Sequence, residues 1–318
     1  MVPAVAARPD VATPGPAHPR EFEAVLEFRA MGTDWRVGAD GPASGTLEAA
    51  RRLIEREEQR CSRFRTDSAL SQLNIERVTS DATLTQIVRD ALRVKRATGG
   101  AFDPTAGAAV IAVGYDRTFE ALTGLVEADP TADVPRPTVT FEGGRMRLRG
   151  DGAIDLGGIA KGWTVDRVAE LLIESGSSRW LVDAGGDIRA GSTTPRMQMP
   201  VAVDLTGLTV GLAGGAVATS STLRRAWDTP LGRMHHIVSP RAGEPAAGPY
   251  VFATVVAPLA ALADALATSI LVDMPSTVAV LSAFEAEALL FDDQGAGTMT
   301  PGMERHLYLA AAECDGAA

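Results

Sequence analysis

The segment PLAALADALATSILVDMP, residues 258–275, is predicted to form a helix that is apolar on every side. Such a helix must be buried, so the fold has to place other elements all around it. Within it, Asp264 and Thr268 are four residues apart, so they share one face of the helix, one turn from each other. A carboxylate in such surroundings costs several kcal/mol unless it is paired or bound to a metal.

The buried position of Asp264 has more than one interpretation. No lysine or arginine lies within a turn of it in the sequence, so no local ion-pair partner is available. A carboxylate and a hydroxyl at this spacing can chelate a hard cation such as Mg²⁺, with water, carbonyl or phosphate oxygens completing the shell. Alternatively, Asp264 caps a second helix that starts after Ala263, or it faces solvent.

Strands and helices are mixed along the chain without regular alternation, which predicts an α+β fold with mostly antiparallel sheets and packed helices. The hydrophobic patterns predict strands or hairpins at 22–40 (with the turn at 31–33), 178–191, 250–258 and 304–310, and amphipathic helices at 46–61 and 81–98. The apolar stretch 277–284 is predicted to be a strand or a buried helix.

Composition narrows the class of protein. The 318 residues can bury a large core, and a net charge of −10 argues against a nucleic-acid-binding surface. No apolar run approaches the ~20 residues that span a bilayer, and Cys61 and Cys314 make no metal set. Residues 1–20 are rich in Pro and Ala and lack both a signal-peptide core and a lipobox cysteine. We therefore expect a disordered leader over 1–20, one domain of two intimate lobes over 21–318, and a cytoplasmic location.

The stretch IDLGGIAKG, residues 154–162, places Asp155, two glycines and Lys161 in a turn just before a predicted helix. Free N–H groups and the dipole at a helix start favour an anion, and a lysine can add a point charge to a phosphate. Neither a Walker A loop nor a G-x-G-x-x-G motif can be written here. The alternative is an ordinary turn with a solvent-facing lysine.

Three other polar stretches are less specific. His235 and His236 are adjacent in a strand-like segment, so at most one of them faces a given site, and His235 is taken as structural. The hydroxyls of VATSS, residues 217–221, can satisfy backbone groups in a turn. Asp183 and Asp187 flank two glycines, a spacing that favours a tight hairpin.

Taken together, these motifs resemble the ApbE family of FAD:protein FMN transferases. The resemblance runs in order from about residue 28 to residue 310. It rests on eight stretches: MGT (31–33), SRFRTDSALSQLN (62–74), GGAFDPT (99–105), DLGGIAKG (155–162), DAGGDI (183–188), VATSS (217–221), HHIVSP (235–240) and ADALAT (263–268). Two positions depart from the family pattern: Ser239 stands where an acid or Asn is common, and Ser221 where Gly is common.

The resemblance implies a fold with an FAD cleft between two lobes, and an enzyme that uses Mg²⁺. FAD is the substrate, FMN is transferred to a Thr or Ser hydroxyl of a partner flavoprotein, and AMP is released. The positions that match FAD-contacting residues of the family are Met31, Phe64, Ala101, Phe102, Asp103, Asp155, Lys161, His236, Ile237 and Val238. The positions that match its metal ligands are the Gly158 carbonyl and the side chains of Asp264 and Thr268.

Two catalytic roles follow from this resemblance. Asp264 is expected to act through the metal, and His236 is the preferred base for the acceptor hydroxyl, with Asp103 or a metal-bound water as alternatives. The same residues are consistent with an FAD pyrophosphatase that gives FMN and AMP, and a non-catalytic flavin-binding protein is a third interpretation. No nucleic-acid partner and no transmembrane segment are expected.

Overall fold

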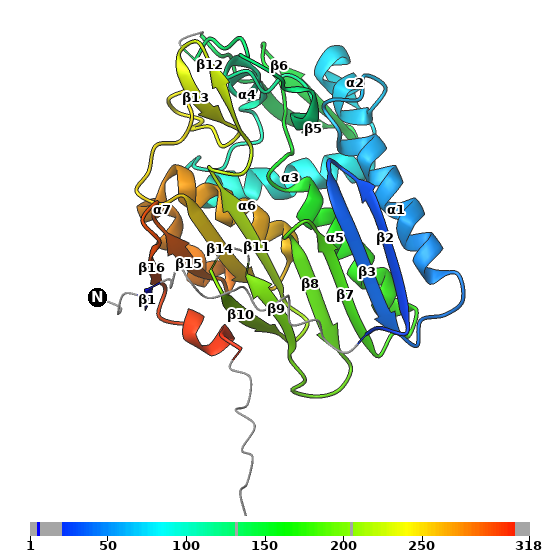
Figure 1. The fold of residues 1–318 in the computed structure, drawn as a ribbon. Helices are drawn as coiled ribbons and strands as arrows, with labels where there is room; N and C mark the ends of the chain where they lie inside the picture. Colours follow the sequence, from blue (N-terminus) through cyan, green and yellow to red (C-terminus); the bar gives the residue numbers. More distant parts are fainter. Residues whose placement is uncertain (1–4, 7–20, 131–132, 204–205, 309–318) are drawn as a thin grey trace, which may run out of the picture.

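One long antiparallel sheet forms the centre of the molecule (Figure 1). The computed structural model describes residues 5–6, 21–130, 133–203 and 206–308. Every strand pairing within the central sheet is antiparallel. In spatial order its strands are β1 (Val5–Ala6), β16 (Ala296–Met299), β15 (Glu287–Phe291), β14 (Phe252–Ala257), β11 (Ala216–Ser221), β8 (Ile188–Ser192), β7 (Arg179–Ala184), β3 (Thr33–Asp40) and β2 (Ala24–Ala30).

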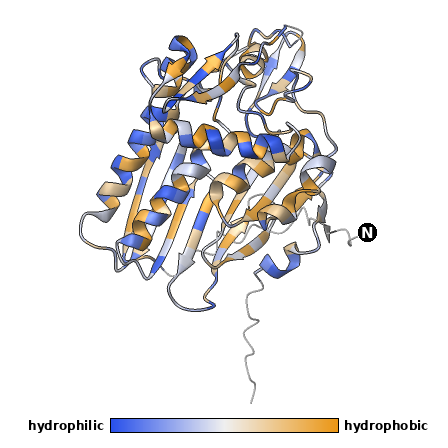
Figure 2. Ribbon diagram, turned by 180° about the vertical axis from the view of Figure 1, so that it is seen from behind, coloured by the Kyte–Doolittle hydropathy of each residue, from blue (hydrophilic) through white to orange (hydrophobic). Residues whose placement is uncertain are grey.

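The two faces of this sheet are covered differently. Helices α1 (Thr46–Cys61), α5 (Ala160–Glu174) and α6 (Ala260–Val272) cover one face, in front of the sheet in Figure 2. The hairpin of β9 (Met199–Val203) and β10 (Leu208–Leu212) covers part of the other. Neighbouring strand residues accordingly enter different cores: Val217 packs toward the hairpin, whereas Ala218 packs toward α6.

A second group of elements lies at one end of the sheet, at the top of Figure 1. It comprises α2 (Ala69–Glu76), α3 (Ala82–Ala97), α4 (Gly107–Ala112), η1 (Phe119–Ala121), a small sheet of β4 (Val78–Thr79), β6 (Arg145–Arg149) and β5 (Thr138–Glu142), and the hairpin of β12 (Ala226–Thr229) and β13 (Gly232–His235). The chain closes with α7 (Met274–Val278), η2 (Leu281–Phe284) and η3 (Met303–His306).

The structure confirms the predicted α+β class. The hairpin at 22–40 forms β2 and β3, and its turn has positive φ at both Met31 (50°) and Gly32 (70°), the geometry of a tight two-residue hairpin turn. The amphipathic helices predicted at 46–61 and 81–98 form α1 and α3. None of the helices in the described part of the chain is both long and apolar enough to span a membrane.

The structure corrects one segment prediction and decides between the alternatives for another. The described part of 304–310 is not a strand and falls largely in η3. Met303 and Leu307 lie about one helical turn apart, so both can pack into the core between the central sheet and the β9–β10 hairpin. For the stretch 277–284 the helical alternative is the correct one, because Asp273 caps α7 by accepting from Ser276 N at 3.2 Å and η2 follows. The predicted disordered leader lies outside the described residues, except for Val5–Ala6 in β1.

Helices α5 and α6 are joined near the start of α6. Asp166 of α5 accepts hydrogen bonds from Ala260 N (2.9 Å) and Ala261 N (3.0 Å), and Arg189 Nη1 lies 3.2 Å from the same carboxylate. A Cβ on Gly162 would lie 2.3 Å from the Ala260 carbonyl oxygen, so the two helices touch backbone to backbone. Asp166 therefore supplies the cap that Leu259 at the α6 N-cap position does not, and it fixes the register of the two helices.

Candidate active site

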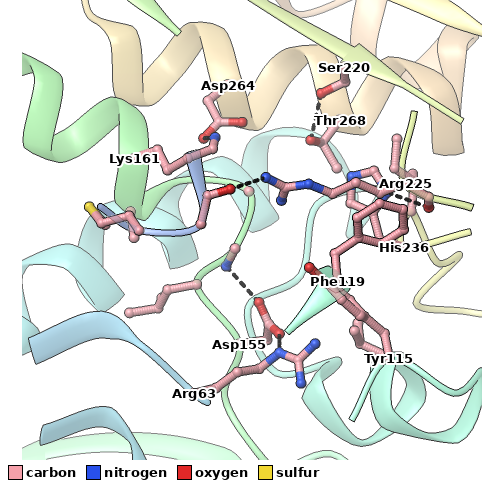
Figure 3. Close-up of a pocket in the computed structure, with 18 of the residues that line it drawn as sticks. Arg63, Tyr115, Phe119, Asp155, Lys161, Ser220, Arg225, His236, Asp264 and Thr268 are labelled. Atoms are coloured by element: carbon pink, nitrogen blue, oxygen red, sulfur yellow. Dashed lines mark hydrogen bonds and ion pairs between the residues drawn. The ribbon is translucent and has the colours of Figure 1, made fainter. Parts of the chain in front are cut away.

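A cavity of about 530 Å³ opens where the helices and the end of the sheet meet the second group of elements (Figure 3). Every residue that the sequence predicted to bind FAD or metal lines it. The β2–β3 turn contributes Met31, the start of α5 contributes Lys161, α6 contributes Asp264 and Thr268, and the segment after β13 contributes His236. The motifs therefore converge in space, and their individual roles stay predictions.

Lys161 faces the acidic centre of the cavity and not solvent. Its Nζ donates to an Asp187 oxygen and lies 3.5 Å from Asp264 Oδ2. The Asp187 and Asp264 side chains are only 5% and 7% exposed, so two buried carboxylates share one ammonium. Burial lowers the pKa of Lys161, but the two carboxylates outweigh it and hold that pKa above its usual value. The solvent-facing interpretation of Lys161 is wrong.

The pKa of the Asp264 carboxyl is strongly raised. Burial and the neighbouring Asp187 charge raise its pKa to about 7, against the opposing effect of Lys161. Asp264 lies inside the continuous helix α6, so it neither caps a second helix nor faces solvent. One turn along, Thr268 Oγ1 lies 3.0 Å from Ser220 Oγ of β11. A Cβ on Gly158 would come within 3.4 Å of that Thr268 oxygen, so the predicted ligand positions Gly158 and Thr268 are adjacent.

These groups suit a hard cation. Among the residues that the structure describes, no three His, Cys, Asp or Glu side chains gather into a metal cluster. Magnesium, however, is commonly held by one or two carboxylates, with waters and substrate phosphates as its other ligands. The Asp264 carboxylate, the Thr268 hydroxyl and the adjoining Gly158 backbone offer oxygen donors of this kind, and the two carboxylates exceed the one ammonium in charge. The donor set therefore fits Mg²⁺.

A second polar cluster lies around the turn that precedes α5. Asp155 accepts from Gly157 N at 2.6 Å, and its other oxygen lies 2.5 Å from Arg63 Nε. The Arg63 guanidinium stacks on aromatic rings, 4.1 Å from the Phe64 centroid and 4.6 Å from the Tyr115 centroid. Arg63 Nη2 is buried and has no hydrogen-bond partner among the described residues.

Aromatic side chains line the adjoining part of the cavity. The Tyr115 ring meets the Phe64 ring edge to face at 5.5 Å, stacks on Trp227 at 5.3 Å, and lies 6.3 Å from the His236 ring. Such a cluster offers flat apolar surface beside polar groups, which suits a planar heteroaromatic ligand. The buried side chains of Ile237 and Val238 extend the same wall.

His236 is fixed by one neighbour. Its backbone N–H donates to the Arg225 carbonyl oxygen at 3.3 Å, and its Nδ1 lies 3.3 Å from the same oxygen. Burial, with the Arg225 charge nearby, lowers the pKa of His236 to about 3, so the imidazole is neutral near pH 7. His235 Nε2 instead lies 3.1 Å from the Ala246 carbonyl and His235 does not line the cavity, which confirms that only one of the pair faces the site.

Asp103 lines the cavity, but its carboxylate is occupied. That side chain is 1% exposed, accepts from Thr105 N at 2.8 Å, and lies 2.8 Å from Lys95 Nζ. These contacts hold the Ala101–Asp103 loop in place with Ala101 and Phe102 at the cavity wall. The arrangement favours His236 over Asp103 as the base.

Sequence reasoning missed several lining residues. Asp187 was assigned only to a hairpin, and Ser220 only to turn backbone groups, yet they contact Lys161 and Thr268. Arg63, Tyr115 and Arg225 were not singled out. Arg63 adjoins the predicted Phe64, and this was the only local signal for any of the three.

Fold and site together define an α+β protein with an enclosed, cation-lined and partly aromatic pocket beside a buried acidic centre. A family model described as the ApbE family matches residues 31–290. The chain therefore belongs to the ApbE family, as its motifs predicted, and the protein is an enzyme of the transferase class.

Individual relatives agree with this membership. The chain is 28% identical over 281 residues to the FAD:protein FMN transferase of Klebsiella pneumoniae, covering 81% of this chain and 80% of that one. The crystal structure of the ApbE protein from Thermotoga maritima superposes with a TM-score of 0.79 at 26% identity, over 90% of this chain and 99% of that chain. The flavin transferase ApbE from Vibrio cholerae superposes with a TM-score of 0.72 at 26% identity, over 89% and 99% of the two chains.

Proposed function

We propose that this protein is a Mg²⁺-dependent FAD:protein FMN transferase that attaches FMN to a Thr or Ser hydroxyl of a partner flavoprotein and releases AMP. One observation carries the proposal: Lys161, Asp264 and Thr268 meet at the floor of a pocket whose other wall is the Phe64–Tyr115 aromatic cluster. A pocket of this composition suits a ligand with both a planar ring system and a diphosphate. The names of the relatives point to the same substrate.

The reaction breaks the diphosphate of FAD. The acceptor oxygen forms a bond to the phosphorus nearest the flavin, and the bond from that phosphorus to the AMP oxygen breaks. AMP leaves with the bridging oxygen and the electron pair, and the hydroxyl proton passes to a base. The protein must therefore neutralise charge, hold attacking and leaving oxygens in line, and accept one proton.

The residues of the pocket can meet these demands. Lys161, held by Asp187, places an ammonium beside the diphosphate. The neutral His236, with Nδ1 held at the Arg225 carbonyl, presents Nε2 as the acceptor for the hydroxyl proton. The Phe64–Tyr115 cluster and the buried Ile237 exclude water from the ring system and orient it. Asp264, Thr268 and the Gly158 carbonyl would hold Mg²⁺, which when bound supplies positive charge to the phosphate oxygens.

The experiment is co-expression with an FMN-binding domain that carries a Thr acceptor, followed by intact-mass spectrometry of that domain. We expect the added mass of one FMN, dependent on FAD and Mg²⁺, and absent when the acceptor Thr is changed to Val. FMN and AMP formed from FAD without any adduct would instead assign the protein as an FAD pyrophosphatase. Binding of FAD with neither product would leave only the flavin-binding interpretation.

A further inference from the structure

The cations of the pocket differ in how far their charge is compensated. Arg63 is paired with Asp155, and Lys161 is shared by Asp187 and Asp264. Arg225 has no carboxylate partner within ion-pair distance in the described part of the chain; its Nη2 donates only to the Gly32 carbonyl, at 3.3 Å. A half-buried guanidinium that faces a cavity with uncompensated charge indicates an anionic ligand.

The position of Arg225 suits such a ligand. Figure 3 shows its side chain extending across the pocket from the His236 side toward the β2–β3 turn. Lys161 and Asp264 lie on one side of the guanidinium, and Asp155 with Arg63 lies on the other. A diphosphate between the aromatic cluster and Lys161 would therefore pass within reach of a planar fork of N–H donors, the geometry that binds phosphate oxygens in pairs.

We propose that Arg225 is the anion-binding arginine of this site, taking the diphosphate of FAD opposite Lys161 and holding His236 through its own carbonyl. The assignment rests on the proposed function for the identity of the anion. Negative charge develops on the oxygen that bridges the two phosphorus atoms as its bond to the flavin-side phosphorus breaks, and a fixed guanidinium beside it stabilises that charge. Arg225 is thus a catalytic residue, because it touches the substrate.

A second consequence concerns the base. The charged groups that act on His236 are Arg225, His235 and Lys161, and the Tyr115 ring packs against its edge. Both cationic side chains, Arg225 and Lys161, disfavour a proton on His236 in the empty pocket. A phosphate bound to Arg225 offsets this charge, so His236 becomes more basic when the substrate is present. The proton acceptor is in this way strengthened by the same contact that binds the diphosphate.

The test compares Arg225→Gln and Arg225→Lys with the wild type and with Arg117→Gln. Arg117 is an exposed arginine that pairs with Asp116 and does not line the cavity, so it controls for the loss of a positive charge. Calorimetry measures the binding of inorganic pyrophosphate, FAD and riboflavin, and NMR follows the titration of the His236 ring.

We expect Arg225→Gln to weaken pyrophosphate and FAD about 10- to 100-fold, the effect of losing a charge-assisted contact, with riboflavin unchanged. Arg225→Lys should fall in between, and Arg117→Gln should match the wild type. In the free Arg225→Gln protein, the pKa of His236 should rise. Unchanged pyrophosphate affinity, or an equal loss for riboflavin, overturns the assignment. Arg225-dependent pyrophosphate binding in a protein that transfers no FMN would instead overturn the proposed function alone.

Discussion

Asp166 is the residue whose replacement most directly tests how the site is held together. It lies on α5, the helix that begins beside Lys161, and it caps α6, the helix that carries Asp264 and Thr268. Changing Asp166 to Ala leaves the N–H groups of Ala260 and Ala261 without their acceptor. We expect both a loss of stability and a change in the relative position of the two helices.

The stability loss can be estimated from the contacts. An N-cap contributes about 1 kcal/mol and up to about 2 kcal/mol, and here two N–H groups bond to one carboxylate. Arg189 also loses the carboxylate that lies 3.2 Å from its Nη1, and an arginine left unpaired adds to the cost. The sum is about 3 kcal/mol. For large domains a change of 1 kcal/mol moves Tm by about 2–4 °C, so Tm should fall by roughly 6–12 °C.

The activity of Asp166→Ala distinguishes a change in the position of the two helices from a mere loss of stability. A displacement of about 1 Å between reacting groups can cost about 100-fold in rate, so kcat for FMN transfer should fall well below that of the wild type. Asp81→Ala is the matched control: Asp81 caps α3 by accepting from Leu84 N at 2.8 Å and pairs with Arg60 at 3.0 Å, but it does not line the cavity.

Both variants should melt earlier, and only Asp166→Ala should lose kcat at a temperature where both are folded. Equal kcat in the two variants would refute the reasoning. It would mean that the buried apolar side chains of α6, and not its cap, hold Asp264 in place.

Three further predictions follow from the site. Asp264→Asn should slow FMN transfer about 100-fold or more while keeping the fold, measured by adduct formation and thermal melting; chelation of the wild type should reproduce the defect and added Mg²⁺ should reverse it. Gly162→Ala should cost about 1–3 kcal/mol in urea unfolding, because the new Cβ would meet the Ala260 oxygen. Folding lowers the pKa of His236, so the unfolded chain binds a proton more readily and the folded state becomes less stable as the pH falls below 6.5. Between pH 6.5 and 5 the free energy of unfolding should fall by about 2 kcal/mol more in the wild type than in His236→Gln.

The fold could be predicted where a periodic pattern is long and local. The helices expected at 46–61 and 81–98 appear as α1 and α3, because each has a clear apolar face over four turns. The strand predicted at 304–310 was wrong because this segment has few apolar residues and the helical turn that it belongs to begins before it, at Met303. The order of strands in the sheet was also beyond the sequence, since β3 pairs with β7 across more than a hundred residues of intervening chain.

The site was predictable for a different reason. Asp264 is a candidate from the sequence alone because a carboxylate inside an apolar helix conflicts with the pattern around it, and such conflicts are expected at functional positions. Its ion-pair partner, Lys161, could not be predicted from the pattern around Asp264, because the two residues are 103 positions apart in the sequence. The pattern around Asp187 predicted only a hairpin turn, and Arg225 gave no signal, since arginines before strands are common in ordinary loops. The side chains of Asp187 and Arg225 come to line the same cavity only in the folded chain.

The acidic centre also links substrate binding to stability. Asp187 and Asp264 are both buried against a single ammonium, and the raised pKa of Asp264 reports that this arrangement is unfavourable when the carboxyl is ionised. On the opposite side, Arg225 has a charge without a carboxylate partner among the described residues. A cation beside the carboxylates and a diphosphate beside the arginine would remove both imbalances at once. Because such ligands bind only the folded chain, they should stabilise it by mass action. If the proposed function holds, the pocket should therefore bind a metal–diphosphate pair more tightly than either component alone.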